Sequence, residues 1–251
     1  DSERFILDRI EKISGEKINF YEIDIKDLDE TRSCFKNKNF DLVIHFAALK
    51  SVNESVKFPD RYYRHNIGSL ENILKCIESE DVGGLVFSSS CTVYGQPDIL
   101  PVTETSPLKK AESPYAETKQ ICEKIIKEFA AINKKPSISL RYFNPVGAHE
   151  SGLIGELPRG VPDNLVPFIT QTAIGKRDKL KVFGDNYNTK DGTPVRDYIH
   201  VVDLAQAHVS AVNRLIKDET KDNYEFYNVG TGTGYSVLEV IKSFERINKI
   251  K

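Results

Sequence analysis

The feature of this sequence that most constrains its fold is the alternation of short apolar runs with segments of helical periodicity. The run 42–46, Leu-Val-Ile-His-Phe, is largely apolar on both faces, which is typical of a buried strand in a parallel sheet. Strands that alternate with helices predict a doubly wound, Rossmann-like α/β fold. We expect strands at 18–23, 41–46, 85–89, 137–143, 180–183 and 226–229, and helices at 27–36, 61–79, 114–133, 164–175, 202–215 and 236–247.

The texture of the chain changes after residue 143, because residues 144–163 are rich in Gly and Pro. Long loops of this kind are where binding residues collect. We therefore expect a Rossmann-like domain over residues 1–143 and a smaller substrate-binding region over most of 144–251, with some segments returning to the first domain. Residues 2–13 read as the second half of a helix, and the chain contains no Met. We expect a glycine-rich βα unit to precede residue 1, and the substrate region to be incomplete at residue 251.

Composition excludes several classes of partner. The chain has 35 basic and 37 acidic residues, so it carries no basic field for nucleic acid or a membrane surface. The four cysteines are far apart and lack metal-ligand spacing, so we expect no metal site and free thiols in a cytoplasmic protein. No apolar run approaches the roughly 20 residues of a membrane span.

The helix expected after Pro114 carries the first chemical signal. Ser113 is a suitable N-cap, and Pro is favoured in the first turn. At 100° per residue, Tyr115 and Lys119 lie on the same stripe as apolar residues further along, so both should point into the protein. The alternative is that Lys119 lies at the edge of the stripe and extends its amine to solvent. The spacing Y-x-x-x-K is weak evidence by itself.

The second signal is a cluster of hydroxyl residues, 88–92, that follows the apolar run 85–87. In open α/β sheets, ligands bind beyond the carboxyl ends of the strands. We therefore expect Ser90 to lie where Tyr115 reaches the same substrate atom. The alternative is a polar turn that caps a short helix.

Several strings of the sequence together resemble one family. They are F-A-A-L-K at 46–50, S-S-S-x-T-V-Y-G at 88–95, S-P-Y-x-x-x-K at 113–119, L-R-Y-F-N-P-V-G-A-H at 140–149, G-L-I-G at 152–155 and the long run 182–204. The chain resembles the extended short-chain dehydrogenase/reductases, and within them the UDP-sugar 4-epimerases, along essentially its whole length. The resemblance implies an NAD-dependent isomerase of galactose metabolism. Such an enzyme interconverts UDP-glucose and UDP-galactose by transient oxidation at sugar carbon 4, and it is a homodimer.

The resemblance also implies a role for each residue of the chemical site. Tyr115 would exchange a proton with the sugar 4-hydroxyl, and Ser90 would hydrogen-bond the same oxygen. Lys119 would hold the nicotinamide ribose. Because an ordinary Tyr pKa is near 10, we expect the charges of Lys119 and of the nicotinamide to lower the pKa of Tyr115.

The same resemblance implies two sets of binding residues. For Asn66, a buried amide satisfied within the protein is the alternative, and for Arg196 it is an ion pair with Asp197 or Asp203. The family often has a second Asn where His65 stands, so the expected helix contact rests on Asn66. The cofactor set is Asp24, Ile25, Phe46, Ala47, Ala48, Leu49, Lys50, Asn66, Ser90, Tyr115, Lys119, Tyr142 and Phe143. The substrate set is Lys50, Ser90, Cys91, Thr92, Tyr142, Phe143, Asn144, Asn164, Leu165, Lys181, Val182, Phe183 and Arg196.

The glycine-rich run 230–234 is a false signal for dinucleotide binding, because its third glycine comes one residue too early. We expect a tight turn into the helix near Ser236. Two alternative functions stay open: another UDP-sugar 4-epimerase, for UDP-N-acetylhexosamines or UDP-pentoses, and a non-catalytic NAD-binding protein of the same fold.

Overall fold

A computed structural model describes residues 3–158 and 160–250. Their contacts divide the chain into two compact units, and the chain passes from one to the other four times, after residues 19, 142, 204 and 229. The larger unit consists of Phe20–Tyr142 and Ala205–Val229. The smaller unit consists of the described parts of Asp1–Asn19, Phe143–Leu204 and Gly230–Lys251.

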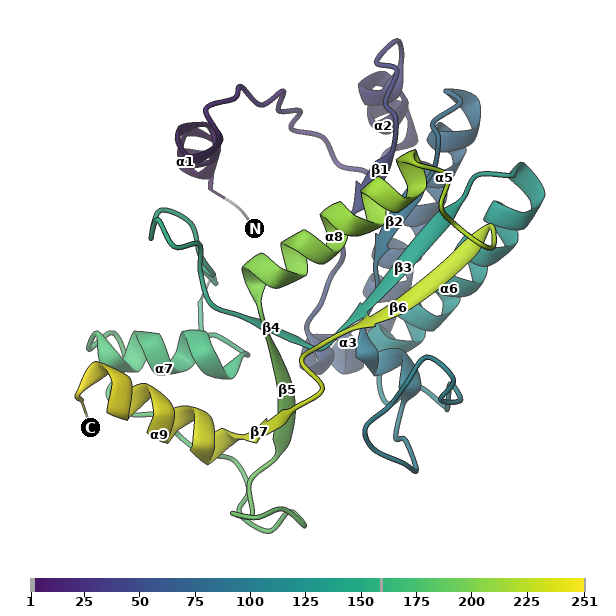
Figure 1. The fold of residues 1–251 in the computed structure, drawn as a ribbon. Coiled ribbons are helices and arrows are strands. Elements are labelled where there is room, and N and C mark those ends of the chain that lie inside the picture. The colour runs from purple at the N-terminus through teal and green to yellow at the C-terminus, as the bar shows by residue number, and fades with distance from the viewer. Residues whose placement is uncertain (1–2, 159, 251) are drawn as a thin grey trace. The chain divides into compact units, whose positions relative to one another are not determined.

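The larger unit is built on a parallel sheet (Figure 1). Its strands are β1 (Val43–His45), β2 (Leu85–Ser88), β3 (Ser137–Tyr142) and β6 (Tyr224–Val229), in the order β1-β2-β3-β6. Every neighbouring pair is parallel. The predicted Rossmann-like α/β fold is therefore confirmed.

Helices supply the two apolar layers that cover this sheet. Alternate residues of a strand point to opposite faces. Leu85 and Phe87 pack with residues of α5 and α6, whereas Val86 packs with residues of β3 and α8. The helices that belong wholly or largely to this unit are α2 (Leu28–Phe35), α3 (Val52–Lys57), α4 (Pro59–Tyr62), α5 (Gly68–Ser79), α6 (Pro114–Asn133) and α8 (Val201–Ile216), with a π-helical turn η1 (Tyr63–Ile67) and a 3₁₀ turn η2 (Cys91–Tyr94).

The smaller unit contains a mixed sheet. Its strands are β4 (Asn144–Val146), β5 (Val195–His200) and β7 (Gly234–Ser236), in the order β4-β5-β7. β4 and β5 are parallel, and β5 and β7 are antiparallel. Its helices are α1 (Phe5–Ser14), α7 (Leu165–Ala173) and α9 (Val237–Asn248).

The glycine-rich run 230–234 is a turn, as predicted. The backbone N–H groups of Thr231 and Gly232 donate to the Asp197 carboxylate at 2.9 and 2.8 Å. The chain then forms β7, which the prediction of a turn into the helix did not include. It enters α9 directly afterwards, and there Ser236 and Glu239 form a reciprocal capping box.

Two of the predicted strands are wrong. Residues 18–23 and 180–183 form no strand, and Phe20 and Phe183 are largely exposed. A strand needs a neighbour for its backbone N–H and C=O groups, and no described segment pairs with either run. Three short strands were missed: β4, β5 and β7. The helix expected to start at residue 61 is preceded by α4, and a π-helical turn interrupts it.

Candidate functional site

Ser90 lies two residues after the end of β2, at the carboxyl end of the parallel sheet, and it caps η2. Its Oγ accepts hydrogen bonds from the backbone N–H of Thr92 at 3.3 Å and from the Thr92 hydroxyl at 3.0 Å. These bonds cap the 3₁₀ turn η2, which was the alternative interpretation from sequence. The same side chain also lies close enough to the phenol of Tyr115 to lower its pKa. One hydroxyl therefore caps a turn and contacts the phenol.

Tyr115 is positioned by the start of α6. The Ser113 hydroxyl accepts a hydrogen bond from the backbone N–H of Ala116 at 3.2 Å, and Pro114 opens the helix. The phenol is half-buried, and burial raises its pKa well above 10, with a further rise from nearby Tyr142. In the protein without NAD, desolvation of the phenolate outweighs the contact with Ser90. The expectation of a lowered pKa includes the charge of the nicotinamide, and it stays a prediction.

Lys119 points into the protein. Only 4% of the residue is exposed, so the alternative of an amine extended to solvent is wrong. Its Nζ donates to the Ser88 carbonyl oxygen at 2.7 Å and lies 4.8 Å from the centroid of the Phe87 ring and 5.9 Å from that of Tyr115. Burial lowers the pKa of Lys119 to about 8, so the amine is mainly protonated at pH 7. The site therefore places a buried positive charge, that of Lys119, one helical turn from the phenol of Tyr115.

His45, at the end of β1, lies beside this cation. It is buried, and its ring stacks on Phe87 with centroids 5.9 Å apart. Burial and the charge of Lys119 lower the pKa of His45 to about 4, so the imidazole is neutral at physiological pH. Of this neighbouring pair, Lys119 is therefore positively charged at pH 7 and His45 is not.

Asn66 is satisfied within the protein, as the alternative interpretation had it. Its Oδ1 accepts from the backbone N–H of Leu49 at 2.8 Å, and its Nδ2 donates to the Leu49 carbonyl at 3.0 Å and to the Thr118 hydroxyl at 3.1 Å. It therefore ties the segment after β1 to α6. A direct contact of Asn66 with the cofactor stays a prediction.

A second buried amide, Asn72, was missed from the sequence. Its Nδ2 donates to the carbonyls of Ile25 at 3.1 Å and of Lys26 at 2.9 Å. Asp24 and Ile25 were predicted to contact the cofactor, and Asn72 fixes the turn that follows them. At 100° per residue, Asn72 lies on the side of the helix over 61–79 opposite the apolar stripe of Leu70 and Leu74, so periodicity gave no signal for it.

The remaining predicted residues of the larger unit lie beyond the strand ends. The Phe46 ring lies 4.5 Å, and the Tyr142 ring 6.2 Å, from the ring of His208 on α8. The hydroxyls of Tyr142 and Ser88 are hydrogen-bonded to each other. Phe46 is 55% exposed, which leaves its ring accessible to a ligand. Ala47, Ala48, Leu49 and Lys50 follow β1, and Cys91 and Thr92 lie in η2.

The other predicted substrate residues lie in the smaller unit. Asn164 precedes α7, which begins at Leu165, and the Asn164 amide donates to Glu156 at 3.0 Å. Arg196 is exposed on β5, and its Nη1 donates to the Val195 carbonyl at 2.7 Å. Its alternative, an ion pair with Asp197 or Asp203, is absent from the described residues. Phe143 and Asn144 stand at the start of this unit, and Lys181, Val182 and Phe183 lie in an irregular stretch.

Two charged residues that the sequence argument passed over are also buried beside the site. Glu123 follows Lys119 by one helical turn, on the stripe already identified, and Arg141 lies in the middle of β3. They form an ion pair, with Nη2 and Oε2 2.6 Å apart. A charge on an apolar stripe and a charge within an apolar strand were the available signals.

The described part of the chain contains no group of three or more His, Cys, Asp or Glu side chains placed to hold a metal ion. None of its helices is both long enough and apolar enough to cross a membrane.

The sequence matches the NAD dependent epimerase/dehydratase family over residues 3–230. It is 48% identical to the UDP-glucose 4-epimerase of Drosophila melanogaster over 241 residues, which are 96% of this chain and 69% of the relative. It is 47% identical to that of Bacillus subtilis over 243 residues, 96% of this chain and 70% of the relative. This chain therefore spans about 70% of the length of both relatives.

Solved structures give the same result. The UDP-glucose 4-epimerase from Bifidobacterium longum, in complex with NAD+ and UDP, has a TM-score of 0.94 at 45% identity, covering 99% of this chain and 73% of that one. The enzyme from Stenotrophomonas maltophila, with bound NAD and formylated UDP-arabinopyranose, also has a TM-score of 0.94, at 44% identity over 100% of this chain and 74% of that one.

Proposed function

Because the chain belongs to the NAD-dependent epimerase/dehydratase family, we propose that Tyr115, Lys119 and Ser90 carry out the proton chemistry of a UDP-glucose 4-epimerase. The function of the chain is the NAD-dependent interconversion of UDP-glucose and UDP-galactose. The observation that carries the residue assignment is local: a buried ammonium and a phenol one turn apart on α6, with a strand-end hydroxyl beside the phenol.

The residues present fit NAD. Lys119 is buried at the carboxyl end of a parallel sheet, where such folds bind nucleotides. An ammonium has three N–H donors, and Lys119 uses one of them on the Ser88 carbonyl. The other two suit the hydroxyls of a ribose. Phe46, Leu49 and the turn at Asp24 would hold further parts of the cofactor.

Bound NAD supplies the acceptor for a hydride from sugar carbon 4 and the donor that returns it. Tyr115 takes the proton of the 4-hydroxyl on its phenolate oxygen as the hydride leaves, and gives that proton back as the hydride returns. Ser90 hydrogen-bonds the same sugar oxygen and orients it toward the phenol. Between the two transfers the substrate would be a 4-keto sugar. This sugar would have to rotate in the site so that its other face can receive the hydride.

The electrostatics of the site explain why Lys119 is required. Burial raises the pKa of Tyr115, so the phenol needs a compensating charge to act as a base at neutral pH. Lys119 is protonated below about pH 8 and supplies that charge from within the protein. Because His45 is neutral at pH 7, the positive charge near the phenol at the end of β1 is that of Lys119.

For the rest of the ligand, we assign the nucleotide end of the UDP-sugar to the predicted residues of the smaller unit. The backbone N–H groups at the start of α7, after Asn164, suit a diphosphate, and the Arg196 guanidinium suits bidentate pairing with phosphate. We also propose that the protein is a cytoplasmic homodimer. The four free cysteines favour a reducing compartment, and light scattering would measure the dimer's mass.

The test is an assay with UDP-galactose and UDP-N-acetylgalactosamine side by side, without added reductant. Substituting Tyr115→Phe should lower turnover of UDP-galactose about 10²–10⁴-fold, because it removes the proton acceptor. NAD should stay bound, as measured by its absorbance after gel filtration. The matched control is Tyr227→Phe, since that hydroxyl bonds Glu225 on β6. If Tyr115→Phe turned over at the parent rate, the assigned chemistry would be wrong.

A further inference from the structure

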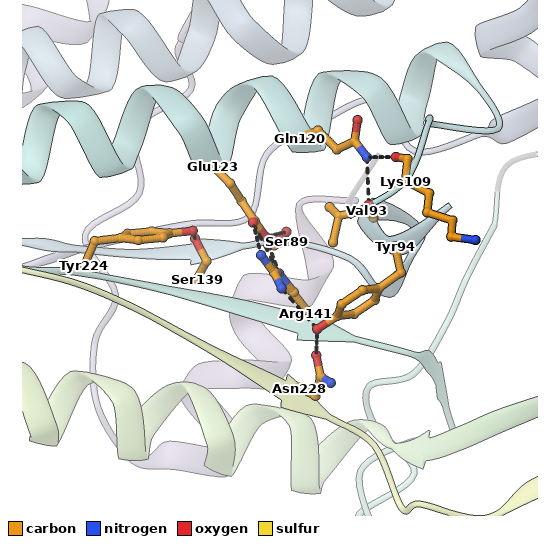
Figure 2. A network of polar contacts seen from close by, with 10 residues as sticks. All are labelled: Ser89, Val93, Tyr94, Lys109, Gln120, Glu123, Ser139, Arg141, Tyr224 and Asn228. Atoms are coloured by element: carbon orange, nitrogen blue, oxygen red, sulfur yellow. Dashed lines mark hydrogen bonds and ion pairs between the residues drawn. The ribbon is translucent and has the colours of Figure 1, made fainter. Parts of the chain in front are cut away.

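A buried ion pair between Glu123 and Arg141 is part of a network of polar contacts that includes Ser89 and Tyr94 (Figure 2). Arg141 donates from Nε to Glu123 Oε1 at 2.9 Å and from Nη2 to Oε2 at 2.6 Å, so the pairing is bidentate. The two side chains are 4% and 5% exposed. Glu123 lies on α6 and Arg141 on β3, so the ion pair connects the helix that carries Tyr115 and Lys119 to the sheet.

Each partner also bonds one end of the segment after β2. At its start, the Ser89 hydroxyl donates to Glu123 Oε1 at 2.5 Å. At its end, Arg141 Nη1 donates to the Tyr94 hydroxyl at 3.0 Å, and that hydroxyl donates to Asn228 Oδ1 at 2.7 Å. Figure 2 shows Arg141 lying between Glu123 and Tyr94.

A third bond comes from the same helix. Gln120, next to Lys119, donates from Nε2 to the Val93 carbonyl and to the Lys109 carbonyl, both at 2.7 Å. The residues bonded in this way bracket Ser90, Cys91 and Thr92. The position of the Ser90 hydroxyl is therefore set from both sides by groups that contact neither the phenol nor the buried ammonium.

Stability alone is a poor reason for such a pair. Burying two charges costs about as much desolvation energy as their attraction returns, and apolar residues of similar volume often stabilise a core as well or better. An apolar pair, however, has no donor for Tyr94 and no acceptor for Ser89. The charge of Glu123 also opposes the lowering of the Lys119 pKa. The hydrogen bonds to Ser89 and Tyr94 have a separate effect, which is to fix the two ends of this segment relative to α6.

We infer that Glu123 and Arg141 are positioning residues, which hold the segment 89–94 so that the Ser90 hydroxyl stays beside the phenol of Tyr115. The inference rests on the proposed function for its effect on turnover, because it takes Ser90 and Tyr115 as the groups that share the sugar oxygen. The inference adds that the distance and orientation between Ser90 and Tyr115 depend on Ser89 and Tyr94, because the hydroxyls of Ser89 and Tyr94 hydrogen-bond the ion pair.

The experiment removes one hydroxyl at a time and leaves the ion pair intact, because removing Glu123 or Arg141 alone would leave a buried charge unpaired. The test variants are Ser89→Ala and Tyr94→Phe in the NAD-loaded protein. The matched control is Tyr227→Phe, which removes a hydroxyl that donates to Glu225 on β6 at 2.9 Å and bonds neither the segment nor the ion pair. Steady-state kinetics with UDP-galactose and hydrogen exchange of backbone amides are the two readouts.

Both test variants should lower kcat about tenfold, because a displacement well below 1 Å at reacting groups has effects of this order. KM should change less than about twofold, since an interaction made only in the transition state is lost. The amides of Val93 and Gly95, which bond Ser90 O and Thr92 O, should exchange about tenfold faster, while the amides of Val86 and Phe87 in β2 keep the parent rate.

The two readouts separate the possible failures. If Ser89→Ala and Tyr94→Phe match Tyr227→Phe in both kcat and exchange, the positioning role is wrong. If exchange in β2 rises together with exchange at Val93, the pair supports the whole core, and the inference is again overturned. If Tyr115→Phe keeps the parent turnover, the proposed chemistry fails, and the exchange data alone then decide whether the pair holds the segment.

Discussion

Replacing Lys119 with Met should make the protein more stable and remove its activity. Met has nearly the length of the Lys side chain and no charge, so it fills the same space beside Phe87 without a buried ammonium. The functional loss follows because Tyr115 then lacks the cation that favours its phenolate. The gain in stability follows from the cost of holding that cation in a site where 4% of the residue is exposed.

The size of the gain follows from the pKa of Lys119. Burial lowers this pKa from 10.5 to about 8, and each tenfold change in proton affinity corresponds to about 1.4 kcal/mol. Protonated Lys119 therefore costs the folded state about 3 kcal/mol. Met also loses the hydrogen bond to the Ser88 carbonyl, which is worth about 1 kcal/mol. The net gain in unfolding free energy at pH 7 is about 2 kcal/mol.

The sign of the pH dependence is fixed by the same values. Below about pH 8 the amine is protonated in both the folded and unfolded states, and the full cost is present. Between about pH 8 and 10.5 the folded state loses this proton while the unfolded state keeps it, so the parent becomes more stable as pH rises. The advantage of Lys119→Met should therefore fall to near zero at about pH 10. Burial raises the pKa of Cys122 from 9.0 to about 12, so this thiol also makes stability depend on pH above about pH 9. Parent and variant share that contribution, and it therefore cancels in the difference between them.

The assay is urea unfolding of parent and variant at pH 7, 8.5 and 10, without added NAD, followed by circular dichroism. The control is Lys124→Met on the exposed face of the same helix, for which the change should stay within about 0.5 kcal/mol. A stability difference that did not change between pH 7 and 10 would refute the reasoning, since it would mean that Lys119 is not desolvated as a cation.

Two further predictions concern groups outside the proton chemistry. Substituting Asn72→Ala removes both hydrogen bonds to the turn after Asp24. A fluorescence titration should show NAD binding weakened about tenfold, or about 1.4 kcal/mol. An affinity for NAD equal to that of Asn248→Ala, a control variant on α9, would contradict this prediction. Substituting Glu225→Gln should destabilise the protein above about pH 4.5, and the loss of stability should disappear as the pH falls toward 2. The reason is that Arg214 holds the pKa of Glu225 at about 2. A difference in urea midpoint between parent and variant that did not depend on pH would count against this.

The larger unit was predictable because its elements carry strong periodic signals. The helix over 114–133 was predicted to the residue, since Ser113 and Pro114 mark its start and a 20-residue amphipathic pattern marks its length. The short strands of the smaller unit carry no such signal. β4 and β7 have three residues each, too few to show alternation, and the pairing of β5 with β7 joins segments far apart in the chain. The run 18–23 shows the converse: its strand pattern is clear, but no described neighbour pairs with it.

The helical stripe gave the inward direction of Tyr115 and Lys119, but periodicity gives direction and not partners. Continued by one turn, the same stripe reaches Glu123, whose charge is balanced from β3 by Arg141, 18 residues away. That balance depends on α6 packing against β3, which no local pattern contains. The same holds for the pKa of Tyr115: the direction of its shift depends on how far burial desolvates the phenol. Spacing therefore identified the residues that we propose to react, whereas packing determines the charge and the orientation of each side chain.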